Sequence, residues 1–309
     1  MKKILSFLLL LTLGISVDAQ TFIVDGLRYT VLSGNTVKTD INYDMGINDY
    51  DIPEIVEYDG RTYAVSCIGS HLTSIESTSV KIPQTIQVIE TRAFARTESL
   101  TKVFIANMGA WVSIDFQGED SNPLSKKSYT NISVYVNGEE TRDIIIPEEV
   151  GAVKKNAFYC CYWLSSIQLP TTLTVIQENA FYRCWGLKSI TLPENINTIK
   201  DYAFYECNGL DSVVVNFSEP IELSGGHQFD DATFNRATLY VPAGCKSAFQ
   251  SAPVWSNFSH IVEKESSGIS PIRAAGHTGK AYNLNGVELP TADAAKGIVI
   301  QGGKKTVRR

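Results

Sequence analysis

Three cysteines recur at a fixed position and are the residues best placed to do chemistry. Cys161, Cys184 and Cys207 are 23 residues apart, and each follows a Phe by three residues. If the segments between them stack, their Cα atoms would repeat at about 4.8 Å, which lies within the range of a disulfide. The spacing therefore allows a row of buried thiols, a disulfide between neighbours or with Cys160, or a soft-metal site. The absence of His at ligand spacing argues against the metal.

A row of aromatic residues accompanies the cysteines. Tyr159, Tyr182 and Tyr205 directly follow the repeated Phe residues, and Trp185 lies three residues after Tyr182. If each Phe points inward, the next side chain points sideways or outward, and stacked segments would form an aromatic strip. Such a strip could stack sugar rings or contact a protein partner. The alternative is packing between neighbouring coils, with the hydroxyl groups in water.

Residues that could form a catalytic or cofactor site are scattered along the sequence. The four histidines are far apart, and none lies in a nucleophile, zinc-protease or phosphate-loop motif. No acidic pair recurs in a way that suggests glycosidase carboxylates. The net charge is −6, and no basic cluster precedes the last six residues, which argues against nucleic acid as a partner. The sequence predicts a protein that is not an enzyme and has no cofactor or metal.

The segments that position these residues follow a 23-residue hydrophobic period. Phe158, Phe181 and Phe204 each follow a Pro by 11 residues, and Phe94 keeps the same distance. Apolar residues also recur five positions before each Phe, and six, nine and eleven positions after it. A fixed period in this range is typical of a leucine-rich solenoid, in which each coil buries its apolar face only against its neighbours.

The predicted fold class is α/β and strand-rich: a right-handed leucine-rich-repeat solenoid with one parallel sheet and short helical turns at the Ala-Phe pairs. Two lysines followed by a short apolar segment predict a secretory signal peptide, and no other segment is long enough to span a membrane. The predicted organisation is a signal peptide at 1–19, an N-terminal β cap at 20–52, the solenoid at 53–263, a linker at 264–280 and a short β tail at 281–309.

One coil follows the pattern Pro170-x-x-Leu173-x-x-Ile176-x-x-x-Ala180-Phe181-x-x-Cys184-x-x-Leu187-x-x-Ile190-x-Leu192. This pattern resembles the BspA-type leucine-rich repeat of secreted and surface proteins common in Bacteroidetes, over about residues 21–263. The tail is similar to the C-terminal sorting segment of secreted proteins from the same group. The resemblance implies a secreted or cell-surface binding protein with a protein or glycan ligand, such as a host adhesin. The alternatives are a structural surface protein without a specific ligand and, third, an enzyme.

The period is interrupted between Phe94 and Phe158, where residues 106–146 are predicted to form one long, irregular coil. We expect Trp111 to pack inward and residues 117–127 to form an exposed loop at one edge of the sheet. Insertions in solenoids often project from the binding face, so this loop and the neighbouring strand face are a candidate binding surface. The alternative is a longer coil variant with no binding role. The candidate residues on this surface are Glu119, Asp120, Asn122, Gln168 and Thr191.

Overall fold

The computed structural model describes residues 20–40, 48–73, 76–125, 132–223 and 225–264, together with four strands between residues 281 and 308. The chain divides into two units, Met1–Ser266 and Ser267–Arg309. The predicted signal peptide and nearly all of the predicted linker lie outside the described residues. Within those ranges, no helix has the length and apolar character needed to cross a membrane.

The first unit begins with antiparallel strands. β1 (Thr21–Val24), β2 (Leu27–Ser33) and β3 (Thr36–Asp40) pair in chain order. Asp25 and Gly26 form the turn between β1 and β2: both residues have positive φ, at 47° and 80°, as a tight two-residue turn requires. β3 then pairs in parallel with β6 (Arg61–Ile68), and β5 (Ile55–Tyr58) pairs antiparallel with β6. The polypeptide thus passes from hairpins to parallel coils at β6.

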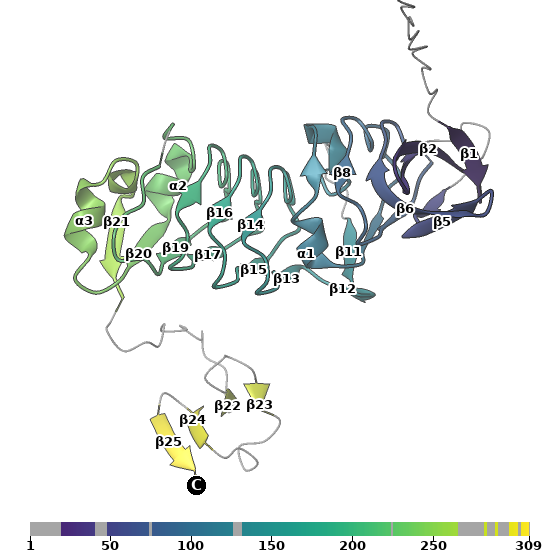
Figure 1. Ribbon diagram of the computed structural model, residues 1–309. Coiled ribbons are helices and arrows are strands. Elements are labelled where there is room, and N and C mark those ends of the chain that lie inside the picture. The colour runs from purple at the N-terminus through teal and green to yellow at the C-terminus, as the bar shows by residue number, and fades with distance from the viewer. Residues whose placement is uncertain are drawn as a thin grey trace, which may run out of the picture. The chain divides into compact units, whose positions relative to one another are not determined.

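Two rows of short parallel strands run along the coils (Figure 1). The first row contains β4 (Asp49–Asp51), β7 (Ser79–Ile82), β9 (Lys102–Ile105), β11 (Ser133–Val136), β13 (Asp143–Ile145), β15 (Ser166–Gln168), β17 (Ser189–Leu192), β19 (Ser212–Val215), β20 (Thr238–Val241) and β21 (His260–Glu263). The second row contains β6, β8 (Val88–Ile89), β10 (Asp115–Phe116), β14 (Ala152–Val153), β16 (Val175–Ile176) and β18 (Thr198–Ile199). The register pairs Ser189 with Ser212 and Val175 with Thr198, so one period separates neighbouring strands.

The structure differs from the predicted single parallel sheet. The first row is divided into three sheets, β12-β11-β9-β7-β4, β13-β15 and β17-β19-β20-β21, and the second row is divided as well. The irregular coil causes the main break. There β11 turns back at Asn137-Gly138 into β12 (Glu139–Glu140), and this antiparallel hairpin ends the first sheet.

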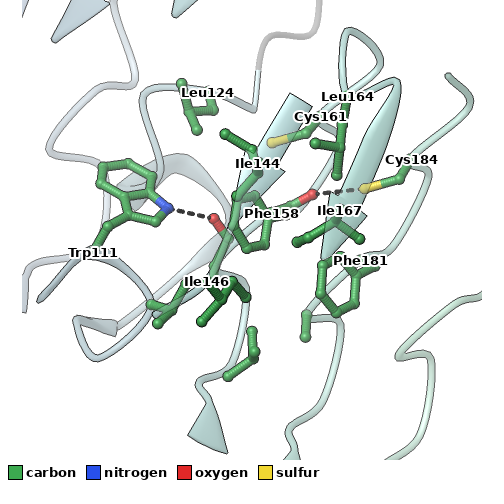
Figure 2. Packing of buried hydrophobic residues seen from close by; sticks show 14 of the residues in the cluster. Trp111, Leu124, Ile144, Ile146, Phe158, Cys161, Leu164, Ile167, Phe181 and Cys184 are labelled. Carbon is green, nitrogen blue, oxygen red and sulfur yellow. Dashed lines mark hydrogen bonds between the residues drawn. The ribbon is translucent and has the colours of Figure 1, made fainter. Parts of the chain in front are cut away.

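The repeated Phe residues form the centre of the core. Phe158, Phe181 and Phe204 are fully buried, and their rings are nearly parallel with centroids 5.3 and 5.2 Å apart. Figure 2 shows Phe158 and Phe181 among the surrounding Leu and Ile side chains. Phe229 continues the row at 5.4 Å from Phe204, although it stands outside the 23-residue period. The core is therefore continuous past the last regular repeat.

The predicted helical turns at the Ala-Phe pairs are hydrogen-bonded turns instead of helices. Within one coil, the N–H groups of Ala157, Tyr159 and Cys161 donate to carbonyls three residues earlier. The alternate N–H groups, for example that of Phe158, donate to the next coil at Ala180 O, 2.8 Å away. A helix would need all these donors for itself. Positive φ at Asn156 and Cys160 turns the alternate groups outward toward the neighbouring coil.

Short helices lie where the period is broken. They are α1 (Met108–Trp111), η1 (Glu119–Ser121), α2 (Asp231–Arg236), α3 (Lys246–Ser251) and η2 (Trp255–Asn257). Asn107 and Asp230 cap α1 and α2 by accepting from the backbone N–H three residues on. Trp255 and Phe258 are buried at the end of the stack, as expected of closing residues. Trp255 Nε1 donates to Ile221 O at 2.8 Å, so its polar group is satisfied there.

The second unit contains four short strands. They are β22 (Ala281–Tyr282), β23 (Glu288–Leu289), β24 (Gly297–Gln301) and β25 (Lys304–Arg308). Their order in the sheet is β23-β22-β24-β25, and every pairing is antiparallel. This sheet therefore does not continue the parallel pattern of the first unit.

Candidate functional site

The tyrosines that follow the repeated Phe residues form a stacked row on the turns. The rings of Tyr159 and Tyr182 have centroids 5.0 Å apart and are 8° from parallel, and those of Tyr182 and Tyr205 are 6.2 Å apart and 4° from parallel. All three side chains are half-buried. Because neighbouring rings cover one another's faces, the row exposes mainly ring edges and hydroxyl groups.

The turn backbone sets the spacing of this tyrosine row. Each Tyr lies between a buried Phe and a residue with positive φ; the latter are Cys160, Arg183 and Glu206. The N–H groups of Phe158 and Phe181 each donate to the following coil at 2.8 Å. Neighbouring turns are thereby held at the distance of paired strands, which is also a favourable distance between aromatic rings.

A charged pair lies within the tyrosine row. Arg183 contacts Glu206 through two bonds, Nε–Oε2 at 2.8 Å and Nη2–Oε1 at 3.1 Å, and its guanidinium lies 5.1 Å from the centre of the Tyr182 ring. The Tyr182 hydroxyl donates to Glu206 at 3.2 Å. Burial, followed by the charge of Glu206, raises the pKa of Tyr182 to about 12. The hydrogen bond from Arg183 lowers the pKa of Glu206 below its usual value, so the pair stays ionised and Tyr182 stays neutral.

Further aromatic side chains extend the surface. Trp185 is half-buried, and its ring lies 4.4 Å from that of Tyr162 at a tilt of 40°. The exposed Tyr202 lies 5.3 Å from Tyr205 and 5.4 Å from the His227 ring. Tyr202 was not among the predicted site residues, because it does not follow a repeated Phe. Tyr202 stands two residues before Phe204, where Asn156 and Asn179 with positive φ mark the same turn position.

The repeated cysteines form a row of buried thiols. None of the six cysteines forms a disulfide, and Cys161, Cys184 and Cys207 are fully buried. Cys184 Sγ donates to Phe158 O at 3.2 Å, and Cys207 Sγ donates to Phe181 O at 3.1 Å. Burial raises the pKa of Cys207 to about 12 and those of Cys161 and Cys184 well above the usual value. Of the alternatives, the structure shows protonated thiols that link one coil to the next.

The family follows from the repeats. Six copies of the region described as "BspA type Leucine rich repeat region" match residues 68–114 and 128–252, more than half of the chain. The chain belongs to the BspA-type leucine-rich repeat family. Proteins built from this repeat are typically non-catalytic binding or surface proteins. Across the ranges that the structure describes, no group of three His, Cys, Asp or Glu side chains could hold a metal ion.

Several solved structures of bacterial leucine-rich repeat proteins are similar to this chain. A cell surface protein of Faecalibacterium prausnitzii is 23% identical with a TM-score of 0.42, and the match covers 64% of this chain and 55% of that protein. This chain thus spans about half of that protein's length. A protein of Bacteroides ovatus is 16% identical (TM-score 0.24; 73% and 86% covered), and one of T. pallidum is 18% identical (0.31; 63% and 71%). No curated protein matches the chain.

The expected exposed loop at residues 117–127 is contradicted at Ser121–Leu124, whereas Gln117 is exposed as predicted. The family match is interrupted at 115–127, yet Ser121, Asn122 and Leu124 are buried, at 0%, 2% and 1% exposure. Asn122 Nδ2 donates to Asn156 O at 2.8 Å and to Ala157 O at 3.0 Å. The Asn122 side chain is therefore buried and hydrogen-bonded to the next coil, so Asn122 is no longer a candidate binding residue. Residues 126 and 127 lie outside the described ranges.

The remaining residues of the predicted irregular surface have mixed positions. Trp111 packs inward as predicted, at 1% exposure, and Nε1 donates to Ala157 O at 3.0 Å (Figure 2). Asp120 is half-buried, and its carbonyl accepts from Phe94 N at 3.1 Å; Glu119 belongs to η1. Gln168 and Thr191 are exposed on β15 and β17. These two lie on the first strand row, whereas the tyrosine row lies on the turns.

Proposed function

We propose that the chain is a non-catalytic, secreted or cell-surface binding protein whose tyrosine row contacts a protein partner. The observation that carries this proposal is the stacking of Tyr159, Tyr182 and Tyr205. A sugar ring that stacks on an aromatic residue needs a free ring face, but here the faces cover one another. Ring edges and hydroxyl groups suit the mixed apolar and polar contacts of protein interfaces, in which Tyr is enriched. A glycan ligand is the second candidate, on the tilted pair Tyr162 and Trp185.

The broader architecture of this proposal is a right-handed solenoid. Parallel pairing at one-period register within each sheet supports it. We also propose that residues 1–19 direct export and are removed, that residues 264–280 link the solenoid to the tail, and that the tail is a sorting segment. The strand-face residues Gln168 and Thr191, together with Glu119 and Asp120, stay candidates for a secondary contact.

The test compares the tyrosine row with a similar tyrosine elsewhere. The double variant Tyr159→Ser/Tyr205→Ser removes two rings from the turns, and Tyr240→Ser removes a half-buried ring from β20 as the control. Each purified protein is applied to arrays of extracellular-matrix proteins and of glycans, after thermal melts have shown that it is folded. We expect that some protein spots bind the native chain and the Tyr240→Ser control but do not bind the double variant. Binding that survives in the double variant would remove the tyrosine row from the proposal.

Other outcomes distinguish the alternative functions. Binding to glycan spots alone would favour the Trp185 pair as the site. Silent arrays, with the protein found at the cell surface by fractionation of the native host, would favour a structural role without a specific ligand. Turnover in a screen of polysaccharides and peptides would support the enzyme hypothesis and would contradict the non-catalytic assignment.

A further inference from the structure

A cavity of about 900 Å³ lies at the N-terminal end of the first strand row, away from the residues used above. Its walls come from the β1–β2 hairpin and from β4, β5 and β7, and they include Val24, Asp25, Asp51, Ile55 and Lys81. The volume is within the range of sites that hold ligands or peptide segments. Ile55 is 56% exposed and offers an apolar surface beside this cavity.

One wall of this cavity is the edge of a sheet. In the described part of the chain, β4 ends its five-stranded sheet and pairs only with β7. Asn48 O accepts from Thr78 N at 2.6 Å, so residue 48 directs its backbone toward β7. Because backbone polar groups alternate along a strand, Tyr50 also faces β7, whereas Asp49 and Asp51 direct their N–H and C=O groups to the open edge. Such an edge is a template for another strand.

The cavity is strongly acidic. Five carboxylates and one ammonium group line it. These charged residues are Asp25, Asp49, Asp51, Glu54, Glu57 and Lys81. Hydrogen bonds from Thr78 and Ser79 lower the pKa of Asp49, so this carboxylate is charged at neutral pH. A polyanion such as a nucleic acid would be repelled here, whereas a cationic segment would be attracted.

The pairing of β4 with β7 shows which neighbour its side chains accept. Lys81 lies directly opposite Asp51 in the register, and Lys81 Nζ is 3.0 Å from Asp51 Oδ1. A strand added on the open side would place its own side chain about 5 Å from Asp51 on the same face. A Lys or Arg at that position would form an ion pair with Asp51, like the one that Lys81 forms from β7. The next residues of that strand would point to the opposite face, where Tyr50 and Ile52 are buried.

We propose that β4 accepts one further strand from a partner protein: an extended segment with Lys or Arg at alternate positions and apolar residues between them. Backbone bonds to Asp49 and Asp51 would supply the pairing, as in other cases of β-strand addition. The carboxylates of the cavity select the basic residues, and Ile55 offers an apolar contact. This site is independent of the tyrosine row, and either can be wrong without the other.

The first experiment uses a defined peptide as the probe. A fluorescein-labelled, amide-capped peptide of sequence Lys-Val-Lys-Val-Lys-Val-Lys is titrated with the full chain, and anisotropy is recorded at low and high salt. We expect saturable binding that weakens as salt rises. Two further versions of the peptide are N-methylated at alternate residues, so that each lacks the N–H groups along one edge of the extended peptide. One of these two versions should lose saturable binding. Equal binding by all three peptides would show that backbone pairing plays no part and would overturn the proposal.

Matched variants separate local pairing from general attraction between charges. Asp51→Asn keeps the backbone donor and should weaken binding by up to about fivefold, as expected for an exposed ion pair. Asp51→Pro also removes the N–H at the open edge and should abolish saturable binding. Glu194→Gln removes an exposed charge outside the cavity and should change nothing. If Glu194→Gln weakens binding as much as Asp51→Asn, or if the peptide does not saturate the native chain, the proposal is wrong. Thermal melts check that each variant is folded. If Asp51→Pro does not fold, the N-methylated peptides alone test whether backbone pairing contributes to binding.

Discussion

The regular repeats at residues 152–215 and the irregular coil at residues 106–146 build the same stack by different means. In the regular repeats, a buried Phe fills each coil, and its backbone N–H donates to the next coil, as from Phe158 to Ala180 O. In the irregular coil, β10 pairs with β8 so that Phe116 lies opposite Ile89. Ser121 therefore stands at the position that Phe94 occupies one coil earlier.

Side chains in the irregular coil replace what the missing Phe would supply. Trp111 and Phe116 are buried, with centroids 5.1 Å apart, and they fill the apolar volume. The Trp111 indole and the Asn122 amide donate to the carbonyls of Ala157 and Asn156, at the coil face where the regular repeats use backbone N–H groups. The difference shows that a coil must fill its core and satisfy its neighbour's carbonyls, but that the Ala-Phe pair is one solution among others.

The largest expected effect is the loss of an aromatic ring from the regular repeats. Phe181→Ala removes a fully buried ring that stacks on two others, so we expect a loss of about 3–5 kcal/mol in the free energy of unfolding. Denaturant melts measure it. A loss below about 1 kcal/mol would place Phe181 outside the core. The regular repeats would then not depend on a buried Phe in each coil.

The second prediction concerns the irregular coil. Asn122→Leu removes both donor bonds and the acceptor for Leu124 N, which is 2.8 Å from Oδ1. Each carbonyl keeps one donor, Trp111 Nε1 at Ala157 O and Tyr159 N at Asn156 O. The buried Leu124 N–H, however, loses its acceptor, and two bonds between coils are lost, so we expect a loss of about 3 kcal/mol. The neighbouring polar residue Gln117 is mostly exposed, and Gln117→Leu serves as the control. If Asn122→Leu melts like the native chain, the side-chain replacement described above is not needed for the stack.

Glycines test how closely the regular coils approach. A Cβ on Gly209 would lie 2.0 Å from Trp185 O, whereas a Cβ on Gly151 would meet nothing within 4 Å. We expect Gly209→Ala to cost about 2 kcal/mol, because the backbone must shift, and Gly151→Ala to be neutral or slightly stabilising. Paired thermal melts compare them. Equal melting temperatures for the two variants would contradict the close packing of the regular coils.

The smallest expected effect at neutral pH is a pH dependence from the thiol row, which acts only in alkaline solution. The pKa of Cys207 is about 12 in the folded chain against 9.0 ordinarily. Between these values the unfolded chain holds fewer protons, so stability falls as pH rises, by about 1.4 kcal/mol per pH unit for this thiol. Below pH 9 the group has no effect. Cys207→Ala should make the alkaline loss shallower than Cys245→Ala, which replaces a half-exposed cysteine. Identical slopes would show that the row does not protect its thiols.

Much of the regular stack was predictable from the sequence, because its positions repeat. The burial of Phe158, Phe181 and Phe204 and the inward position of Trp111 were predicted and are confirmed. The tyrosine row was predicted as well, from one residue type at one position after each Phe. The stacking of its rings face to face was not predictable, because it depends on the turn geometry. The irregular coil was mispredicted at Ser121–Leu124, since a polar run in a sequence is indistinguishable from an exposed loop until its partners are known.

The sequence alone determined the period, the family and the set of inward positions, since a repeated coil must bury the same positions each time it stacks. Only the tertiary structure decided how those coils are joined. It divided the strands among several sheets, because β11 turns into a hairpin at the irregular coil. It placed Asn122 beneath the next coil and, among the residues that the structure describes, left one edge of β4 without a neighbouring strand beside an acidic cavity. Local sequence cannot specify such features, because a side chain's burial and a strand's free edge depend on residues that are distant in the chain.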